Sequence, residues 1–275
     1  MNRQSGFALV NGAKLYYEVA GAGRPLLLIH AGVADSRMWD EHFDDFAGHY
    51  RVMRYDLRGF GRSMMPAVAY ASYEDAAGLL DFLGVAQAQV VGISFGGRIA
   101  LDLALAYPER VTALVLGAPS VGGQRPPVEV LRFAEAEDAA LERGDLDAAT
   151  ELNLRMWVDG PYRTPDQVDA AVRRRVGEMQ RHAFTIPEPE DAEEQPLAPP
   201  AIERLAEVRA PTLVLVGDQD IPDKVVVAER LAAEIPGARM AVIPGVAHML
   251  SMEKPAVFSQ LVLDFLQAVE KEHAG

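Results

Sequence analysis

Short apolar runs alternate with longer amphipathic stretches along most of the chain. The first two runs flank Asn11-Gly12, a dipeptide typical of a two-residue hairpin turn. The later runs are mostly apolar throughout, as expected for strands that are buried on both faces of a sheet. The pattern predicts eight strands, the first two antiparallel, at residues 7–10, 14–19, 26–29, 51–55, 89–91, 111–116, 212–216 and 239–243.

The stretches between these strands have the spacing of amphipathic helices. Strands that alternate with helices form a mostly parallel sheet with helices on both faces. The sequence therefore predicts an α/β fold with an eight-stranded, mostly parallel sheet. The predicted helices of this core are residues 37–47, 72–83, 95–107, 224–233 and 256–271.

The alternation of strands and helices is interrupted once. Between residues 120 and 208 the pattern is helical, at 130–144, 146–158 and 164–183. A stretch rich in proline and acidic residues follows at 186–200, and this composition is typical of a surface linker. We therefore predict a core made of residues 1–119 and 209–275, with residues 120–208 inserted as a helical cap.

Composition and charge narrow the class of function. A length of 275 residues allows one large core, and the net charge of -14 argues against binding to nucleic acid or to an anionic membrane surface. The chain has no cysteine, which excludes disulfides and thiolate chemistry. We find no signal peptide and no apolar run long enough to span a membrane. We expect a cytoplasmic protein that acts on a small molecule and could form a homo-oligomer.

The first candidate for chemistry is Ser94. The strand that ends at residue 91 leads directly into Gly-Ile-Ser-Phe-Gly-Gly at 92–97, and a predicted helix follows. Small neighbours allow a sharp turn, which exposes the serine Oγ at the positive end of that helix. A plain glycine-rich turn is the alternative, but the strand before it and the helix after it favour a nucleophile.

A serine nucleophile needs a neighbouring base. Of the six histidines, His248 alone follows a late strand and precedes the last helix, in a loop at the carboxyl edge of the sheet. His30 ends a buried strand, and we expect it to shape the adjacent loop. We expect His182 to lie on a solvated face of the cap. His248 is therefore the predicted base.

The base in turn needs an acceptor on its second ring nitrogen. Asp218 and Asp220 both follow the strand at 212–216. Because they are two residues apart, an extended backbone points both side chains to the same side, and strand periodicity cannot distinguish them. Asp220 is favoured because it lies further along the turn toward the His248 loop. We expect Asp223 to be a helix N-cap and Glu253 to face solvent.

These segments resemble the α/β-hydrolase family over nearly the whole chain. The matching segments are residues 27–32, 55–63, 92–97, 216–220 and 245–248. Within the family, residues 31–39 most resemble 3-oxoadipate enol-lactonases and their cofactor-free haloperoxidase relatives. Two positions depart from the family pattern. Ala31 separates His30 from Gly32, and Ile93 stands where His or Asn is common.

The resemblance supports the order Ser94, Asp220, His248, because this fold carries its triad in that order. It also implies that Gly32 donates a backbone N–H to the oxyanion, with Val33 as the alternative. Phe95 supplies the other N–H, since it follows the nucleophile at a helix N-terminus.

Further side chains are candidates for the substrate pocket. These are Trp39, Met156, Trp157 and Met249. Arg37 and Arg62 are candidates for binding a substrate carboxylate, although a structural salt bridge with Asp35 or Asp56 is the favoured role. No nucleotide-binding or metal-binding pattern is present, so we expect neither a cofactor nor a metal.

The sequence thus favours a serine hydrolase that cleaves a carboxylic ester or lactone through an acyl-Ser94 intermediate. Carbon–carbon bond hydrolysis or acyl transfer would use the same triad with a different pocket. A ligand-binding protein without activity is a third alternative, and the presence of candidates for all three triad members argues against it.

Overall fold

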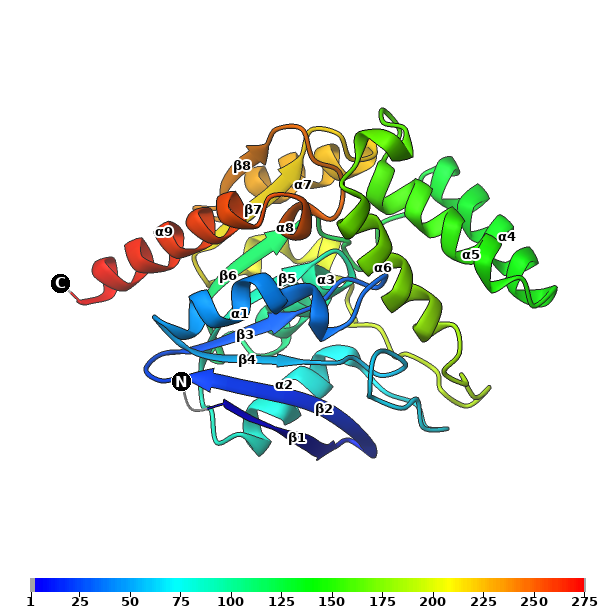
Figure 1. Cartoon of the computed structure of the whole chain (residues 1–275). Helices are drawn as coiled ribbons and strands as arrows, with labels where there is room; N and C mark the ends of the chain where they lie inside the picture. Colours follow the sequence, from blue (N-terminus) through cyan, green and yellow to red (C-terminus); the bar gives the residue numbers. More distant parts are fainter. Residues whose placement is uncertain (1–2, 275) are drawn as a thin grey trace.

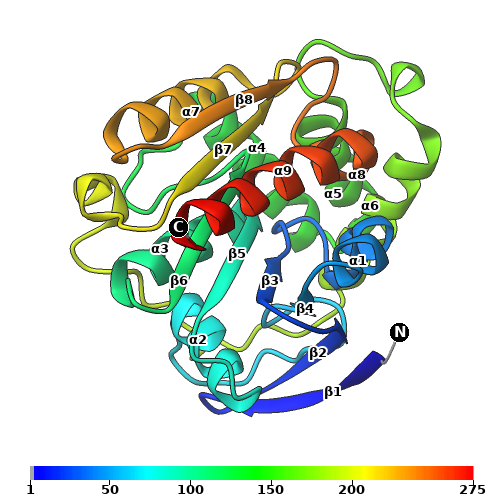
Figure 2. The same ribbon diagram turned by 90° about the vertical axis from the view of Figure 1, so that its left-hand side faces the viewer.

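The computed structural model describes the backbone of residues 3–274 and the side chains of residues 3–272. In this part of the chain eight strands form one sheet in the order β1-β2-β4-β3-β5-β6-β7-β8 (Figures 1 and 2). Strand β2 is antiparallel to both of its neighbours. The other strands of the sheet, β4, β3, β5, β6, β7 and β8, run parallel to one another. The strands are β1 (Arg3–Val10), β2 (Ala13–Gly21), β3 (Pro25–Ile29), β4 (Arg51–Tyr55), β5 (Ala88–Ile93), β6 (Val111–Gly117), β7 (Thr212–Gly217) and β8 (Arg239–Ile243).

Helices cover both faces of this sheet. Those of the core are α1 (Asp40–Ala47), α2 (Ser72–Phe82), α3 (Phe95–Ala106), α7 (Pro222–Glu234), α8 (Leu250–Glu253) and α9 (Pro255–Ala274). Helices α2, α3 and α7 share one apolar cluster with the sheet, and α1 and α9 share a second. In β3, Leu27 and Ile29 belong to the first cluster and Leu26 and Leu28 to the second. Both sides of the strand are therefore buried, and the predicted α/β fold is confirmed.

The predicted helix at residues 37–47 is divided. It begins as a 3₁₀ turn, Ser36–Trp39, and α1 follows at Asp40. The Asp35 side chain accepts a hydrogen bond from the backbone N–H of Arg37 and so starts this turn.

Residues 120–208, all of them described, contribute no strand to the sheet. Their helices are α4 (Val128–Glu142), α5 (Leu146–Asn153), a π-helical turn (Leu154–Asp159) and α6 (Ala170–Ala183). They lie together at one end of the sheet (Figure 1). The π turn continues the predicted helix at 146–158. The predicted helix at 164–183 begins only at Ala170, because Thr164 caps a separate 3₁₀ turn.

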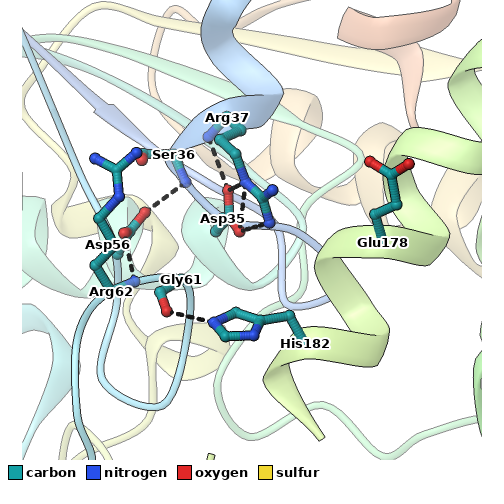
Figure 3. A pocket seen from close by; sticks show the side chains of 8 residues that line it. All are labelled: Asp35, Ser36, Arg37, Asp56, Gly61, Arg62, Glu178 and His182. Carbon is teal, nitrogen blue, oxygen red and sulfur yellow. Dashed lines mark hydrogen bonds and ion pairs between the residues drawn. The ribbon is translucent and has the colours of Figure 1, made fainter. Parts of the chain in front are cut away.

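Helix α6 and the acidic stretch after it contact the core directly. The His182 ring lies beside the loop after β4, with its Nε2 atom 2.8 Å from the carbonyl oxygen of Gly61 (Figure 3). Further along, Glu194 accepts a hydrogen bond of 2.6 Å from the Ser72 hydroxyl and pairs with Arg98 on α3. The stretch predicted to be a linker is thus attached to the core at this point.

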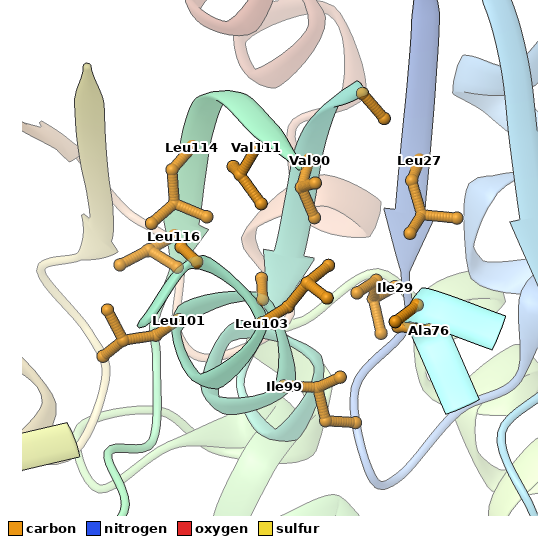
Figure 4. Close-up of a cluster of buried hydrophobic side chains, with 14 of the residues drawn as sticks. Leu27, Ile29, Ala76, Val90, Ile99, Leu101, Leu103, Val111, Leu114 and Leu116 are labelled. Atoms are coloured by element: carbon orange, nitrogen blue, oxygen red, sulfur yellow. The ribbon is translucent and has the colours of Figure 1, made fainter. Parts of the chain in front are cut away.

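Helix α3 packs on the middle of the sheet, where Ile99, Leu101 and Leu103 meet side chains of β3, β5 and β6 (Figure 4). Gly96 lets its first turn approach β3. A Cβ atom on Gly96 would lie 2.4 Å from the carbonyl oxygen of Ile29, and that contact is too short for any side chain. The close approach therefore depends on glycine.

We predict that Gly96→Ala lowers the free energy of unfolding by at least ~1–3 kcal/mol, because two strand carbonyls would have to move. Gly177→Ala is the matched control, since it is also helical but its Cβ would lie 3.4 Å from a Leu154 methyl carbon. The control should keep or raise stability, as alanine favours helix over glycine. Urea unfolding followed by circular dichroism measures the free energy of unfolding of both variants. If Gly96→Ala proved as stable as Gly177→Ala, the packing argument would be contradicted.

Candidate active site

Ser94 lies in the sharp turn between β5 and α3. Its backbone angles, φ 56 and ψ -114, are rarely adopted by residues other than glycine and store strain of about 1–3 kcal/mol. Three backbone hydrogen bonds hold the turn. The Ser94 N–H donates to Gly117, and the Ser94 carbonyl accepts from Arg98 and Ser120 at 3.1 Å each. The turn exposes part of Ser94, whereas Ile93 before it is fully buried.

His248 lies in the loop between β8 and α8, and its Nδ1 atom is 2.8 Å from Oδ2 of Asp220. Both residues are only 1% exposed. The second carboxylate oxygen of Asp220 accepts the backbone N–H of Ile221 at 2.8 Å, so both oxygens are in use and the carboxylate has one orientation. With Asp220 ionised, Nδ1 carries the proton and Nε2 keeps its lone pair.

Asp218 is engaged elsewhere. Its Oδ1 atom accepts the backbone N–H of Gly245 at 2.6 Å, which ties the turn after β7 to the turn after β8. Of the two acids that the sequence left open, Asp220 is therefore the one in contact with His248.

Ser94 Oγ and His248 Nε2 form no hydrogen bond, with each other or with any other group in residues 3–272. Catalytic hydrogen bonds are often long before substrate binds and shorten in the substrate complex.

The expectation that Glu253 faces solvent is wrong. Its carboxylate accepts the backbone N–H of Ala247 at 2.9 Å and pairs with Arg163 of the cap at 2.5 Å. The Glu253 side chain is 7% exposed, and it holds the residue just before His248. Asp223 is also not the expected N-cap, because α7 begins at Pro222, one residue before it.

Trp157 brings residues 120–208 into contact with His248. The ring centroids of Trp157 and His248 lie 4.7 Å apart. On Trp157, the Phe133 ring packs edge-on with its centroid 5.7 Å away. Trp157 lies in the π turn, which ends at Gly160 with φ 73. A Cβ on Gly160 would lie 2.4 Å from the carbonyl oxygen of Gln219, so the cap meets the Asp220 turn at close range.

The other pocket candidates lie in different surroundings. Met156 lines an apolar pocket of about 790 Å³ between α4, the π turn and α7, on the Phe133 side of Trp157. Trp39 and Met249 have no exposed surface, and Trp39 packs against His42 and Phe258 in the core.

Gly32 and Phe95, the predicted oxyanion donors, are neighbours. A Cβ on Gly32 would lie 3.4 Å from the Phe95 Cβ, and both residues line a pocket of about 280 Å³. Val33 is buried beside them. His30 joins this loop to the loop after β4: its Nδ1 atom lies 2.8 Å from the carbonyl oxygen of Ala31, and its Nε2 accepts the backbone N–H of Leu57 at 2.9 Å. Burial lowers the pKa of His30.

Arg37 and Arg62 are both held by other groups. Arg37 forms a two-pronged salt bridge with Asp35, and the Arg62 guanidinium lies over Tyr16, 3.8 Å from Glu18. Both line a polar pocket of about 330 Å³ that also contains His182 (Figure 3). Arg37 is therefore engaged by Asp35, whereas the Arg62 side chain is 54% exposed and makes only this longer contact with Glu18.

Within the described residues, no group of three His, Asp or Glu side chains is arranged to hold a metal ion. No helix in that part of the chain is long and apolar enough to cross a membrane.

The family model for the alpha/beta hydrolase fold matches residues 24–255. The chain belongs to the α/β-hydrolase family. It is 31% identical to a protein of Azorhizobium caulinodans named carbamate hydrolase RutD, over 94% of this chain and 97% of the relative. It is 30% identical to a 2-hydroxy-6-oxononadienedioate/2-hydroxy-6-oxononatrienedioate hydrolase of Burkholderia vietnamiensis, over 92% and 91%.

Among solved structures, the enol-lactonase from Burkholderia xenovorans LB400 superposes with a TM-score of 0.77 at 25% identity. The match covers 95% of this chain and all of that one (100%). The expected resemblance to α/β-hydrolases is therefore confirmed, and the chain is a hydrolase by family.

Breaking the Arg163–Glu253 pair should destabilise this hydrolase. We predict that Arg163→Met lowers the free energy of unfolding by about 3–5 kcal/mol, because Glu253 keeps a buried charge without its partner. In the double variant with Glu253→Gln the amide oxygen still accepts the Ala247 N–H, so part of the stability should return. Urea unfolding of the two single variants and the double variant measures the coupling. Strictly additive losses would show that the pair does not interact.

Proposed function

We propose that this hydrolase cleaves a carboxylic ester or lactone with Ser94 as nucleophile, His248 as general base and Asp220 as the acid that orients it. The observation that carries the proposal is the buried hydrogen bond of 2.8 Å between His248 Nδ1 and Asp220 Oδ2. It leaves Nε2 as the basic nitrogen at the edge of the sheet where Ser94 is exposed.

In the proposed reaction Ser94 Oγ attacks the carbonyl carbon while its proton passes to His248 Nε2. The backbone N–H groups of Phe95 and Gly32 stabilise the oxyanion, and Phe95 has its N–H at the first turn of α3. The His248 proton then goes to the leaving oxygen as the ester bond breaks. Water, deprotonated by the same base, releases the acid and regenerates Ser94.

Carbon–carbon bond hydrolysis is the second candidate. It is favoured by the 30% identity to the 2-hydroxy-6-oxononadienedioate/2-hydroxy-6-oxononatrienedioate hydrolase. The likeness to the enol-lactonase favours the ester or lactone reaction. Turnover of p-nitrophenyl esters and lactones, compared with that of a dienoate substrate, distinguishes the two candidates.

We predict that Ser94→Ala lowers turnover on the best ester by a factor on the order of 10⁶, because no other group can form the acyl intermediate. A fluorophosphonate should label the wild-type protein at Ser94, as read by mass spectrometry of peptides. Circular dichroism of the variant serves as the control for folding. A label on a different serine would reject the assignment.

Asp220→Asn and Asp218→Asn separate the two acids. In Asp220→Asn an amide faces His248 Nδ1 and favours the wrong tautomer, which we expect to lower turnover about 10⁴-fold. In Asp218→Asn the side-chain oxygen can still accept the Gly245 N–H, so we expect a loss of about tenfold or less. Both are assayed on the same ester after a check of folding. If Asp218→Asn loses about 10⁴-fold in turnover and Asp220→Asn stays active, Asp220 is not the orienting acid.

A further inference from the structure

Lys224, near the start of α7, is a buried lysine. Its exposure is 7%, and its ammonium donates to the Ser120 hydroxyl at 3.1 Å and to the Pro119 carbonyl oxygen at 3.4 Å. Within the described residues it has no carboxylate oxygen within 4.0 Å. An ammonium has three N–H donors, so at least one lacks an acceptor, and a buried charge without an ion pair is unusual.

The ammonium lies next to the proposed catalytic residues. Its Nζ atom is 5.9 Å from the centroid of Trp157, whose ring is 4.7 Å from that of His248. Ser120, which accepts from Lys224, donates its own backbone N–H to the Ser94 carbonyl at 3.1 Å. Lys224 therefore borders the same indole as His248 and contacts the loop that supports Ser94.

The nearby acids are already engaged by other groups. Asp220 binds His248 and the Ile221 N–H, and Asp223 accepts from the Gln124 amide. Burial lowers the pKa of Lys224, while the charges of Asp220 and Asp223 oppose that shift. The positive charge is thus held near two acids that make no direct contact with it, and beyond its two oxygen acceptors its neighbour is the face of the Trp157 ring.

The geometry points to Lys224 as a specificity-determining residue, whose ammonium binds a free carboxylate on the substrate beside Trp157. The inference rests on the proposed ester or lactone hydrolysis and narrows it to substrates that carry a second, unesterified acid group. Arg37 is paired with Asp35, and the half-exposed Arg62 lines the polar pocket beside His182, which neither Lys224 nor Trp157 lines. If Lys224 instead only tied α7 to Ser120, its loss would affect charged and neutral substrates equally.

Kinetics on a matched pair of esters tests this role. Monomethyl adipate and methyl hexanoate have similar chains, but only the first carries a carboxylate. Lys224→Met should raise KM for monomethyl adipate by about tenfold to a hundredfold, and change KM for methyl hexanoate less than about twofold. Lys14→Met, which removes an exposed lysine on β2, is the control for net charge and should change neither. Equal changes in KM for both esters would overturn the proposal.

A binding measurement tests the same contact without turnover. In the Ser94→Ala background, which prevents turnover, calorimetric titration should show that the protein binds monomethyl adipate about tenfold more tightly than methyl hexanoate, or better. Lys224→Met should remove that difference, and Lys224→Gln should do the same if the methionine variant fails to fold. An unchanged preference in either folded variant would reject Lys224. If the wild-type protein hydrolysed neither these esters nor any p-nitrophenyl ester or lactone, the proposed function would fail, while the titration would still decide the anion site.

Discussion

The candidate active site depends on backbone packed directly against backbone around Ser94. A Cβ on Gly92 would lie 2.2 Å from the Gly96 carbonyl oxygen, and one on Gly96 would lie 2.4 Å from that of Ile29. These contacts force the chain to turn within a few residues, and they place Ser94 in a conformation that side chains rarely adopt. The strain is sustained because β5 and α3 are fixed by the two apolar clusters of the sheet.

A second set of close contacts joins the loops that hold the other two triad candidates. A Cβ on Gly217 would lie 2.2 Å from the carbonyl oxygen of Val246, so the turn that carries Asp220 touches the loop that carries His248. Asp218 bridges the same two loops through the Gly245 N–H. The short His248–Asp220 distance is therefore set by the backbone around it and does not rely on these two side chains alone.

Much of this arrangement could be predicted from the sequence. The strands were recognisable because both faces are buried, which makes runs such as Leu26–Ile29 wholly apolar. The turn at Ser94 was recognisable because its glycines fall at fixed offsets between a strand and a helix. His248 was recognisable because no other histidine follows a late strand.

The remaining features depend on contacts between residues that are far apart in the chain. The sequence predicts that Glu253 faces solvent, because no residue near it in the chain indicates that Arg163, 90 residues earlier, forms a salt bridge with it. The burial of Lys224 has no local signal either, since helix α7 would read as amphipathic with that lysine on its polar side. The π-helical turn could not be told from an ordinary helix, because it differs only in hydrogen bonds that span five residues instead of four.

The apolar cluster beside α1 and α9 has a consequence for how this protein can change. Leu154, Val158, Val176 and Met179 of residues 120–208 are buried in that same cluster, together with side chains of the sheet. The residues over the site therefore share one hydrophobic interior with the scaffold and do not form a detachable lid. Substitutions of these four side chains must therefore repack the interior that keeps the sheet folded. Changes on the opposite side of the same helices, where Met156 lines an apolar pocket, leave the shared interior intact.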